Sequence, residues 1–242
     1  MPVSVVYDAI APHYACHRGA LDFVVDALRR LHGQSPGGPV LEVGCGTGDY
    51  VTAIAKTGSC KGFGMDPSRQ MLERAPIYER ISYLQGRAAS LPFADQSIDM
   101  IFSVNVVHHL NNVGHYFRES LRILNPGGIL CTATDSEAII KRRRPLSQYW
   151  PSTVPVELAR YHDIDALRER MAAAGICRIG QCEGRSDFPI PDIGPYRDKA
   201  FSCLGLIPAE AFARGLLTME SDLRAGPLEG TSELVFLWGE RR

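Results

Sequence analysis

A glycine-rich segment near residue 44 is the first place in the sequence where residue types and spacing suggest chemistry. The apolar run Val40–Val43 ends at Gly44, and Gly46 and Gly48 follow at alternate positions. Glycines let a backbone pass close to a ligand, and free amides at the start of a helix offer hydrogen-bond donors and a positive dipole. The segment therefore predicts a nucleotide-like cofactor held at Gly44 and Gly46. A tight strand-to-helix turn is the alternative, because short glycine motifs also match by chance.

Two carboxylates beside this segment narrow the choice of cofactor. Asp66 ends the next predicted strand, about twenty residues downstream, where doubly wound folds place an acid that accepts hydrogen bonds from ribose hydroxyls. Glu42 lies just before the first glycine, where it would repel the pyrophosphate of a dinucleotide and attract an ammonium group. We expect an adenosine-containing cofactor that carries a positive group near Gly44.

Polar side chains also follow the fourth predicted strand. His108 and His109 lie at the carboxyl edge of the sheet, where ligands of open α/β folds bind. Either histidine is a candidate catalytic base, a role that typically contributes about 10²–10⁴-fold to a rate. Packing and capping of the strand end is the alternative for both. Asn105, on the same edge, is a candidate for orienting the cofactor or the substrate.

An alternation of strands and helices must position these residues. Apolar runs predict strands, and amphipathic or capped segments between them predict helices. Such alternation implies right-handed crossovers and a doubly wound sheet. The expected strands are 39–43, 62–65, 81–84, 98–104, 129–134, 176–181 and 233–238, and the expected helices are 21–31, 50–56, 71–75, 116–124 and 163–175.

The second half of the chain is less regular. Residues 136–161 contain several prolines and predict an irregular insertion. The stretch 195–224 is expected to be largely helical, and the strands on either side of it are expected to pair as a hairpin at the sheet edge. The basic run Lys141–Arg144 could attract an anionic substrate, but a charge run is usually a solvated face.

Composition sets limits on the class of protein. The chain has 242 residues, of which 45% are hydrophobic and 22% charged, enough to bury a substantial core. A formal net charge of −1 argues against a general nucleic-acid binder. We expect no membrane span and, because residues 1–14 show no export signal, a cytoplasmic protein. A monomer and a homodimer are both compatible with the sequence.

The cysteines predict neither a disulfide framework nor a zinc site. There are seven of them, an odd number, and no two form a CxxC pair. We expect them to be small, buried apolar residues and expect no bound metal.

Residues 40–135 resemble class I S-adenosylmethionine-dependent methyltransferases, particularly the group related to quinone-biosynthesis methyltransferases. The resemblance implies a Rossmann-like, doubly wound α/β fold whose seven-stranded sheet has an antiparallel last strand, with helical lid and insertion elements. It also implies that Gly44, Gly46 and Asp66 contact S-adenosylmethionine, which leaves as S-adenosylhomocysteine, and that Tyr14 closes over the cofactor. The motifs that carry it are Glu42-x-Gly44-x-Gly46-x-Gly48, Asp66, Leu91-Pro92-Phe93, Val107-His108-His109-Leu110 and the segment from Leu121 to Gly128.

The resemblance also suggests how the chain is divided. One domain is expected over 1–242, with a lid and helix in 1–34, a cofactor-binding core in 35–135, substrate-side insertions and an edge strand in 136–232, and the last strand in 233–242. Further candidates for the wall of the acceptor cavity are His13, His17, Tyr161 and His162.

One position departs from the family's pattern. Many relatives carry an acid after the glycine that follows the third strand, where it binds the adenine amino group, but here Arg87 stands in that place. Backbone groups of Ala88 and Ala89, with the apolar wall around Leu91, are then expected to hold adenine. The expected activity is methyl transfer to an oxygen, nitrogen or carbon atom of a small molecule. Alternatives are a non-catalytic cofactor-binding member of the family and an NAD(P)-dependent oxidoreductase, which would leave Glu42 unexplained.

Overall fold

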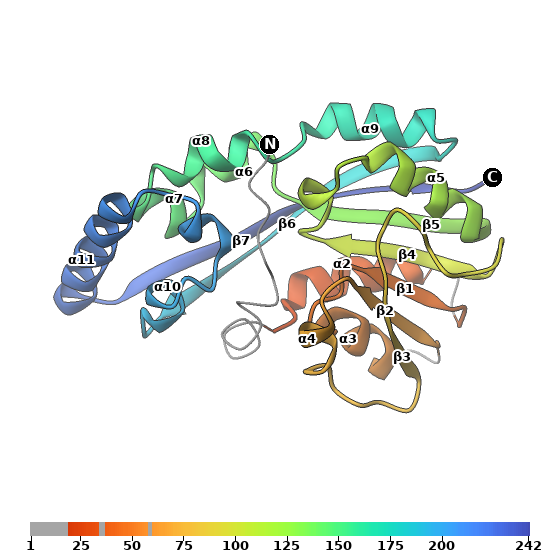
Figure 1. Cartoon of the computed structure of the whole chain (residues 1–242), viewed down its shortest axis with the longest axis horizontal. Helices are drawn as coiled ribbons and strands as arrows, with labels where there is room; N and C mark the ends of the chain where they lie inside the picture. Colours follow the sequence, from red (N-terminus) through yellow and green to blue (C-terminus); the bar gives the residue numbers. More distant parts are fainter. Residues whose placement is uncertain (1–18, 34–36, 58–59) are drawn as a thin grey trace.

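A single seven-stranded sheet organises the chain, with its strands in the order β3-β2-β1-β4-β5-β7-β6 (Figure 1). The structure is a computed structural model that describes residues 19–33, 37–57 and 60–242. Strands β1 to β5 are parallel, and β7 runs antiparallel between β5 and β6. The predicted doubly wound sheet with an antiparallel last strand is therefore confirmed. The strands are β1 (Val40–Val43), β2 (Gly62–Asp66), β3 (Ile81–Gln85), β4 (Ile98–Val104), β5 (Leu124–Thr134), β6 (Cys177–Ile190) and β7 (Leu228–Glu240).

Helices cover both faces of the sheet (Figure 1). On one face, Leu28 and Ile54 pack in a core with Phe102 of β4. On the other face, Phe117 packs in a core with Ile101 of the same strand. Because both faces are covered, β4 is apolar on both sides, as a central parallel strand must be. The first face carries α2 (Asp22–His32) and α3 (Asp49–Thr57), the second carries α5 (Val113–Ile123) and α9 (Ile164–Ala173), and the short α4 (Arg69–Leu72) and η1 (Val107–His109) follow β2 and β4.

Strands β6 and β7 are much longer than the predicted strands 176–181 and 233–238. Their ladder continues to the pair Ile190↔Leu228, far beyond the other strands. In β6, the charged residues Glu183, Arg185 and Asp187 alternate with less exposed neighbours. Backbone pairing, and not an apolar run, sustains this outer strand, so hydrophobicity alone could not predict its length.

Residues 136–161 contain three short helices joined by turns, so the predicted irregular insertion is wrong over those helices. The three helices there are too short to show an amphipathic period, although Ser136 caps the first by accepting a hydrogen bond from the Ile139 amide. The expected helical stretch from 195 to 224 is confirmed. These helices are α6 (Glu137–Arg142), α7 (Leu146–Tyr149), α8 (Thr153–Leu158), α10 (Gly194–Arg197), η2 (Ser202–Gly205) and α11 (Ala209–Ala225).

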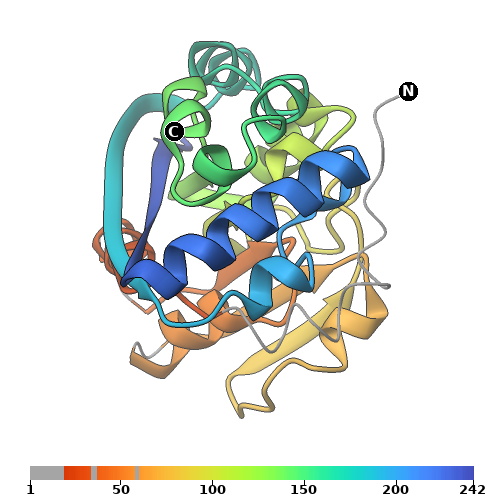
Figure 2. The same ribbon diagram turned by 90° about the vertical axis from the view of Figure 1, so that its left-hand side faces the viewer.

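The helices of this second half form a cap around the long ends of β6 and β7. Trp150 is fully buried at its centre and stacks on Tyr196 and Phe212. Figure 2, which faces this end of the molecule, shows α11 lying across it. The cap therefore has a hydrophobic core of its own beside the two cores of the sheet.

Strand β5 begins at Leu124 and not at residue 129 as predicted. The Asn-Pro-Gly-Gly segment follows the end of α5 at Ile123, close to the predicted end of that helix, and also lies inside the strand. Gly127 has φ +78°, and its amide donates to the Arg241 carbonyl at 2.8 Å. Pairing with Arg241, which is remote in sequence, therefore extends the strand back to the end of the helix.

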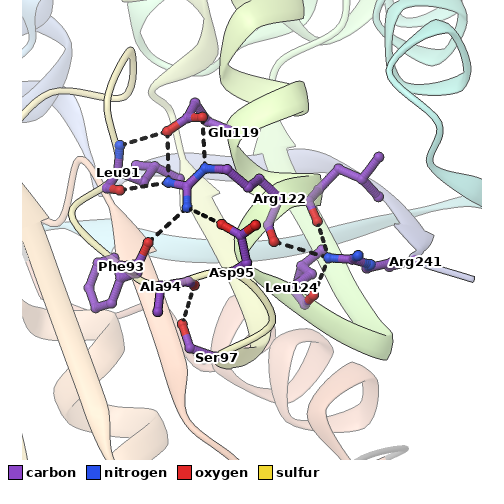
Figure 3. A network of polar contacts seen from close by, with 10 residues as sticks. Leu91, Phe93, Ala94, Asp95, Ser97, Glu119, Arg122, Leu124 and Arg241 are labelled. Atoms are coloured by element: carbon purple, nitrogen blue, oxygen red, sulfur yellow. Dashed lines mark hydrogen bonds and ion pairs between the residues drawn. The ribbon is translucent and has the colours of Figure 1, made fainter.

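Arg122 of α5 fastens the loop that contains the Leu-Pro-Phe motif (Figure 3). Its guanidinium donates to the carbonyls of Leu91 and Phe93, each at 2.9 Å, and pairs with Asp95 and Glu119. Planar, divergent donors suit arginine to such a junction. The loop after β3 is thus held against the helix that follows β4.

Candidate functional site

The glycine-rich turn leaves β1 with its backbone in conformations that suit glycine. Gly44, Gly46 and Gly48 have φ values of +72°, +53° and +75°. A Cβ atom on Gly44 would lie 2.4 Å from Cγ2 of Val106, so no larger residue fits there without movement. Glycine is therefore required at this position by both conformation and space.

Glu42 is buried beneath this turn. Its side chain is 2% exposed, and its Oε2 accepts a hydrogen bond of 2.8 Å from the Val51 amide of α3. Burial raises the pKa of the Glu42 carboxyl well above its ordinary value, and the neighbouring Asp49 and Asp66 raise it further. A cationic ligand group here would favour the ionised carboxylate. The sequence predicts such a group, an ammonium, beside Glu42.

A small pocket of about 60 Å³ opens at the turn and brings several predicted residues together. Glu42, Gly44, Gly46 and Asn105 all line it. The space equals only about two water molecules, so it suits one end of a cofactor and not the whole. Its other lining residues are Gly19, Cys45, Thr47, Asp49, Tyr50 and Val104.

Asn105 lines this pocket and has a side-chain oxygen that accepts no hydrogen bond from the described residues. It follows β4 with φ +56°, and its amide donates to the Ala133 carbonyl. Its Oδ1 is buried and has no hydrogen-bond partner among the residues that the structure describes. A buried acceptor without a donor is costly, so Asn105 is suited to receive a hydrogen bond from a ligand.

Asp66 lies behind the turn and does not line the small pocket. Its Oδ2 accepts a hydrogen bond from the Gly46 amide at 2.9 Å, and its Oδ1 accepts one from the Ser68 amide at 2.8 Å. Each carboxylate oxygen can accept a further bond, so ribose binding by Asp66 is compatible with these contacts. Asp66 thus shapes the glycine turn as well as ending β2.

Ala88 and Ala89, which were also predicted to contact the cofactor, do not line the small pocket. Ala88 packs partly against the core, and the Ala89 carbonyl contacts Nε2 of His115 at 2.8 Å. Leu91, expected as an apolar wall for adenine, is 2% exposed and belongs to the core itself. Arg87 is exposed. Tyr14 lies outside the described residues, as do His13 and His17.

A larger cavity of about 450 Å³ adjoins the small pocket. The two share Gly19, Tyr50 and Asn105 in their linings. The volume falls within the usual range of about 300–1,000 Å³ for small-molecule sites. One part of its lining is apolar and comes from the cap and from the long antiparallel pair of β6 and β7. It includes Leu146, Phe188, Pro189, Ile190, Tyr196 and Phe201.

The other part of the lining is polar and includes both predicted histidines. His108 stacks on Tyr161, with ring centroids 3.9 Å apart, and contacts the His109 ring at the same distance. Burial lowers the pKa of His108 well below its ordinary value, and burial together with the Arg160 charge lowers that of His109 to about 4. Both imidazoles are therefore neutral near pH 7. Tyr161 lines the cavity as expected, whereas His162 does not.

A chain of buried ion pairs, which the sequence did not predict, borders the same wall. Arg143 pairs with Asp135 at 3.0 Å and with Glu157 at 3.2 Å, and Glu157 also pairs with Arg160 at 2.7 Å. Arg143 belongs to the basic run interpreted as a solvated face, and for this residue that interpretation is wrong. The preceding residue, Arg142, is about half exposed and pairs with Glu233 instead.

The predicted burial of the cysteines is confirmed only in part. Among residues 19–33, 37–57 and 60–242, no group of His, Cys, Asp and Glu side chains could hold a metal ion. Cys45, Cys60, Cys131 and Cys203 are buried as expected, but Cys177 is partly exposed and Cys182 exposed. In the same ranges, no helix has both the length and the apolar character of a membrane span.

A glycine turn after β1, an acid at the end of β2 and this strand order define an α/β fold that binds an adenosine-containing cofactor. Comparison with known proteins narrows the class. A methyltransferase domain family matches residues 41–132. The chain is 28% identical to the 2-methyl-6-phytyl-1,4-hydroquinone methyltransferase of Synechocystis sp., over 77% of this chain and 63% of that protein. It thus spans less than two thirds of that relative.

A second relative agrees with this class, and a solved structure shares the fold. The demethylmenaquinone methyltransferase of Staphylococcus epidermidis is 30% identical, over 64% of this chain and 69% of that protein. A solved methyltransferase structure from Anabaena variabilis superposes with a TM-score of 0.72 at 20% identity, over 89% of this chain and 96% of the other. The chain belongs to the class I S-adenosylmethionine-dependent methyltransferases, in the group related to quinone-biosynthesis enzymes. Its cofactor is S-adenosylmethionine, so the oxidoreductase alternative is set aside.

Proposed function

We propose that this methyltransferase carries its acceptor in the larger cavity, with the reacting atom beside Asn105 and the polar wall. The acceptor would be a small molecule with a hydroxylated ring and an apolar arm. The observation that carries the proposal is the junction of the two sites, since Gly19, Tyr50 and Asn105 line both the small pocket and the larger cavity. A methyl donor in one and an acceptor in the other would meet at this junction.

The residues of the small pocket, together with Asp66 behind the glycine turn, fit the cofactor. Glu42 would face its ammonium group, the amides of the glycine turn would meet its carboxylate, and Asp66 would accept from its ribose. The unpartnered Oδ1 of Asn105 supports this fit, because it needs a donor that the described part of the chain does not supply. When bound, S-adenosylmethionine supplies an activated methyl group on a sulfonium. The chain then has mainly to align the acceptor and exclude water.

The two kinds of cavity wall support an acceptor of mixed character. An apolar arm would lie against Phe188, Ile190 and Tyr196, and a hydroxylated head would lie near His108, His109 and Tyr161. The names of two relatives give a hydroquinone that carries a phytyl group and a demethylmenaquinone as their substrates. The ion pairs on the polar wall balance one another in charge, which suits an uncharged head.

The remaining expectations belong to this proposal. We propose one domain over 1–242, a cofactor-binding core in 35–135 and acceptor-side elements in 136–232, with Tyr14, Ala88 and Ala89 as additional cofactor contacts. We also propose a cytoplasmic location, which the free, exposed thiol of Cys182 supports. Small molecules, and not nucleic acids, would be its substrates.

An acceptor screen with labelled methyl tests the proposal. Purified protein is incubated with methyl-labelled S-adenosylmethionine and a panel that contains demethylmenaquinol, 2-methyl-6-phytyl-1,4-hydroquinone and the charged amine phosphoethanolamine. We expect label on a ring acceptor and none on phosphoethanolamine. Asn105→Ala should reduce transfer, whereas Asn111→Ala, at an exposed position nearby, should not. Transfer to phosphoethanolamine alone would contradict the acceptor class, and cofactor binding without transfer to any acceptor would favour a non-catalytic protein.

A further inference from the structure

The hydrogen bond between Arg160 and His109 decides which nitrogen of the histidine carries the proton. Nη2 of Arg160 lies 3.4 Å from Nδ1 of His109. A guanidinium has donors only, so Nδ1 must accept. In an imidazole whose Nδ1 accepts, the proton is on Nε2.

Arg160 is held firmly in the position that makes this bond. Its Nη1 lies 2.7 Å from Oε1 of Glu157, and the two side chains are only 9% and 4% exposed. The other oxygen of Glu157 binds Arg143, which in turn pairs with Asp135. Arg160 is thus the last member of a buried chain that starts at the end of β5 and reaches the histidine after β4.

The charged and titratable groups around the histidine pair oppose a second proton on it. They are Arg160, Arg143, His162 and the neighbouring His108. Glu157 and Asp135 are already engaged by the two arginines. His109 is therefore poorly suited to take a proton from an acceptor, since an effective base has a pKa near the working pH.

We infer that Arg160 is a positioning residue that fixes the proton of His109 on Nε2, so that His109 meets the acceptor as a hydrogen-bond donor and not as a base. In this tautomer, Nε2 interacts with a neighbouring group through its N–H, as a hydrogen-bond donor. The acceptor should then present an oxygen lone pair at this wall, from a hydroxyl, phenolate or carbonyl, and not an ammonium group. This last step rests on the proposed function, whereas the tautomer does not.

Nitrogen NMR of protein labelled with ¹⁵N-histidine tests the tautomer without any acceptor. His109→Gln identifies the signals. In the wild-type protein near neutral pH, we expect Nε2 of His109 to carry the proton and Nδ1 to be unprotonated. In Arg160→Met, which removes the donors but keeps most of the volume, we expect a mixture of tautomers and a pKa of His109 above its wild-type value of about 4. The control Arg197→Met removes an exposed arginine of the cap and should change neither.

The outcomes separate the inference from the proposed function. A wild-type His109 with its proton on Nδ1 would overturn the inference, even if Arg160→Met fails to fold. A wild-type tautomer that persists in Arg160→Met would overturn the part played by Arg160. With an active acceptor, His109→Gln, whose amide can donate in place of Nε2, should keep more activity than His109→Phe, by about tenfold in kcat for one lost hydrogen bond. Equal losses would overturn the donor role, and no transfer to any acceptor would count against the proposed function alone.

Discussion

Gly46 and Asp66 are joined by a hydrogen bond of 2.9 Å from the backbone amide of the glycine to Oδ2 of the aspartate. One carboxylate thus holds the glycine turn after β1 and marks the end of β2. Shape and chemistry of the proposed cofactor site are therefore coupled through Asp66. Replacement of this residue should affect the cofactor in two ways, through lost ribose contacts and through a looser turn.

We predict that Asp66→Ala weakens binding of S-adenosylmethionine by about 1–3 kcal/mol, the scale of hydrogen bonds to a charged group. Asp66→Asn keeps an oxygen acceptor for the turn and should lose less. Calorimetric titration measures both, with Asp165→Ala, an exposed aspartate of α9, as the control. Unchanged affinity in a folded Asp66→Ala protein would remove Asp66 from the site.

Glu42→Gln should change the pH dependence of stability. The folded-state pKa of Glu42 is raised above its ordinary value of 4.5, so the folded protein holds this proton where the unfolded chain has released it. The free energy of unfolding of the wild type should therefore fall as pH rises from about 4.5 toward that raised pKa. Glu42→Gln removes this decline and should be the more stable protein at neutral pH. Urea unfolding at several pH values measures the difference, and parallel curves for the two proteins would contradict it.

The same substitution should weaken the cofactor. An ammonium group beside Glu42 favours the carboxylate, so binding of S-adenosylmethionine should release a proton from the wild type. Calorimetry in buffers of different ionisation enthalpy counts this proton. We expect release by the wild type and none from this site in Glu42→Gln, together with lower affinity. Equal proton release by both proteins would show that the cofactor's ammonium lies elsewhere.

Gly44→Ala and Gly127→Ala form a matched pair. Both glycines have positive φ, +72° and +78°, but an added Cβ meets Val106 only at Gly44. The Gly127 variant should lose about 1–2 kcal/mol from conformation alone, and the Gly44 variant a further 1–3 kcal/mol from overpacking. Val106→Ala in the Gly44→Ala background should recover part of that excess. Equal losses in the two single variants, measured by urea unfolding, would mean that no clash occurs at Gly44.

His109 should make the protein less stable in acid. Its pKa is lowered from 6.5 to about 4 in the folded state, so the unfolded chain binds the proton more readily between these values. The free energy of unfolding contributed by this group is complete above pH 6.5 and is lost as pH falls toward about 4. His109→Gln should therefore show a shallower decline across this range. An identical slope would indicate that His109 has an ordinary pKa.

Residue patterns within short segments predicted those parts of the fold that depend on neighbours in sequence. Apolar runs such as 98–104 and the glycine turn at Gly44 depend on neighbours in sequence, and the strands and the turn were predicted correctly. The length of β6 was not, because charged residues such as Arg185 occupy an exposed edge strand held by backbone pairing. Arg143 was missed for a related reason, since only the packing of three short helices buries this residue of the basic run in ion pairs at the cavity wall.

Calorimetric titration of the purified protein, freed of carried-over ligand, with S-adenosylmethionine, S-adenosylhomocysteine and NAD tests the account most directly. We predict saturable binding of the two sulfur compounds and none of NAD, because the buried Glu42 suits an ammonium group and not a pyrophosphate, beside which it could not ionise. Binding of NAD alone, or of none of the three, would contradict it.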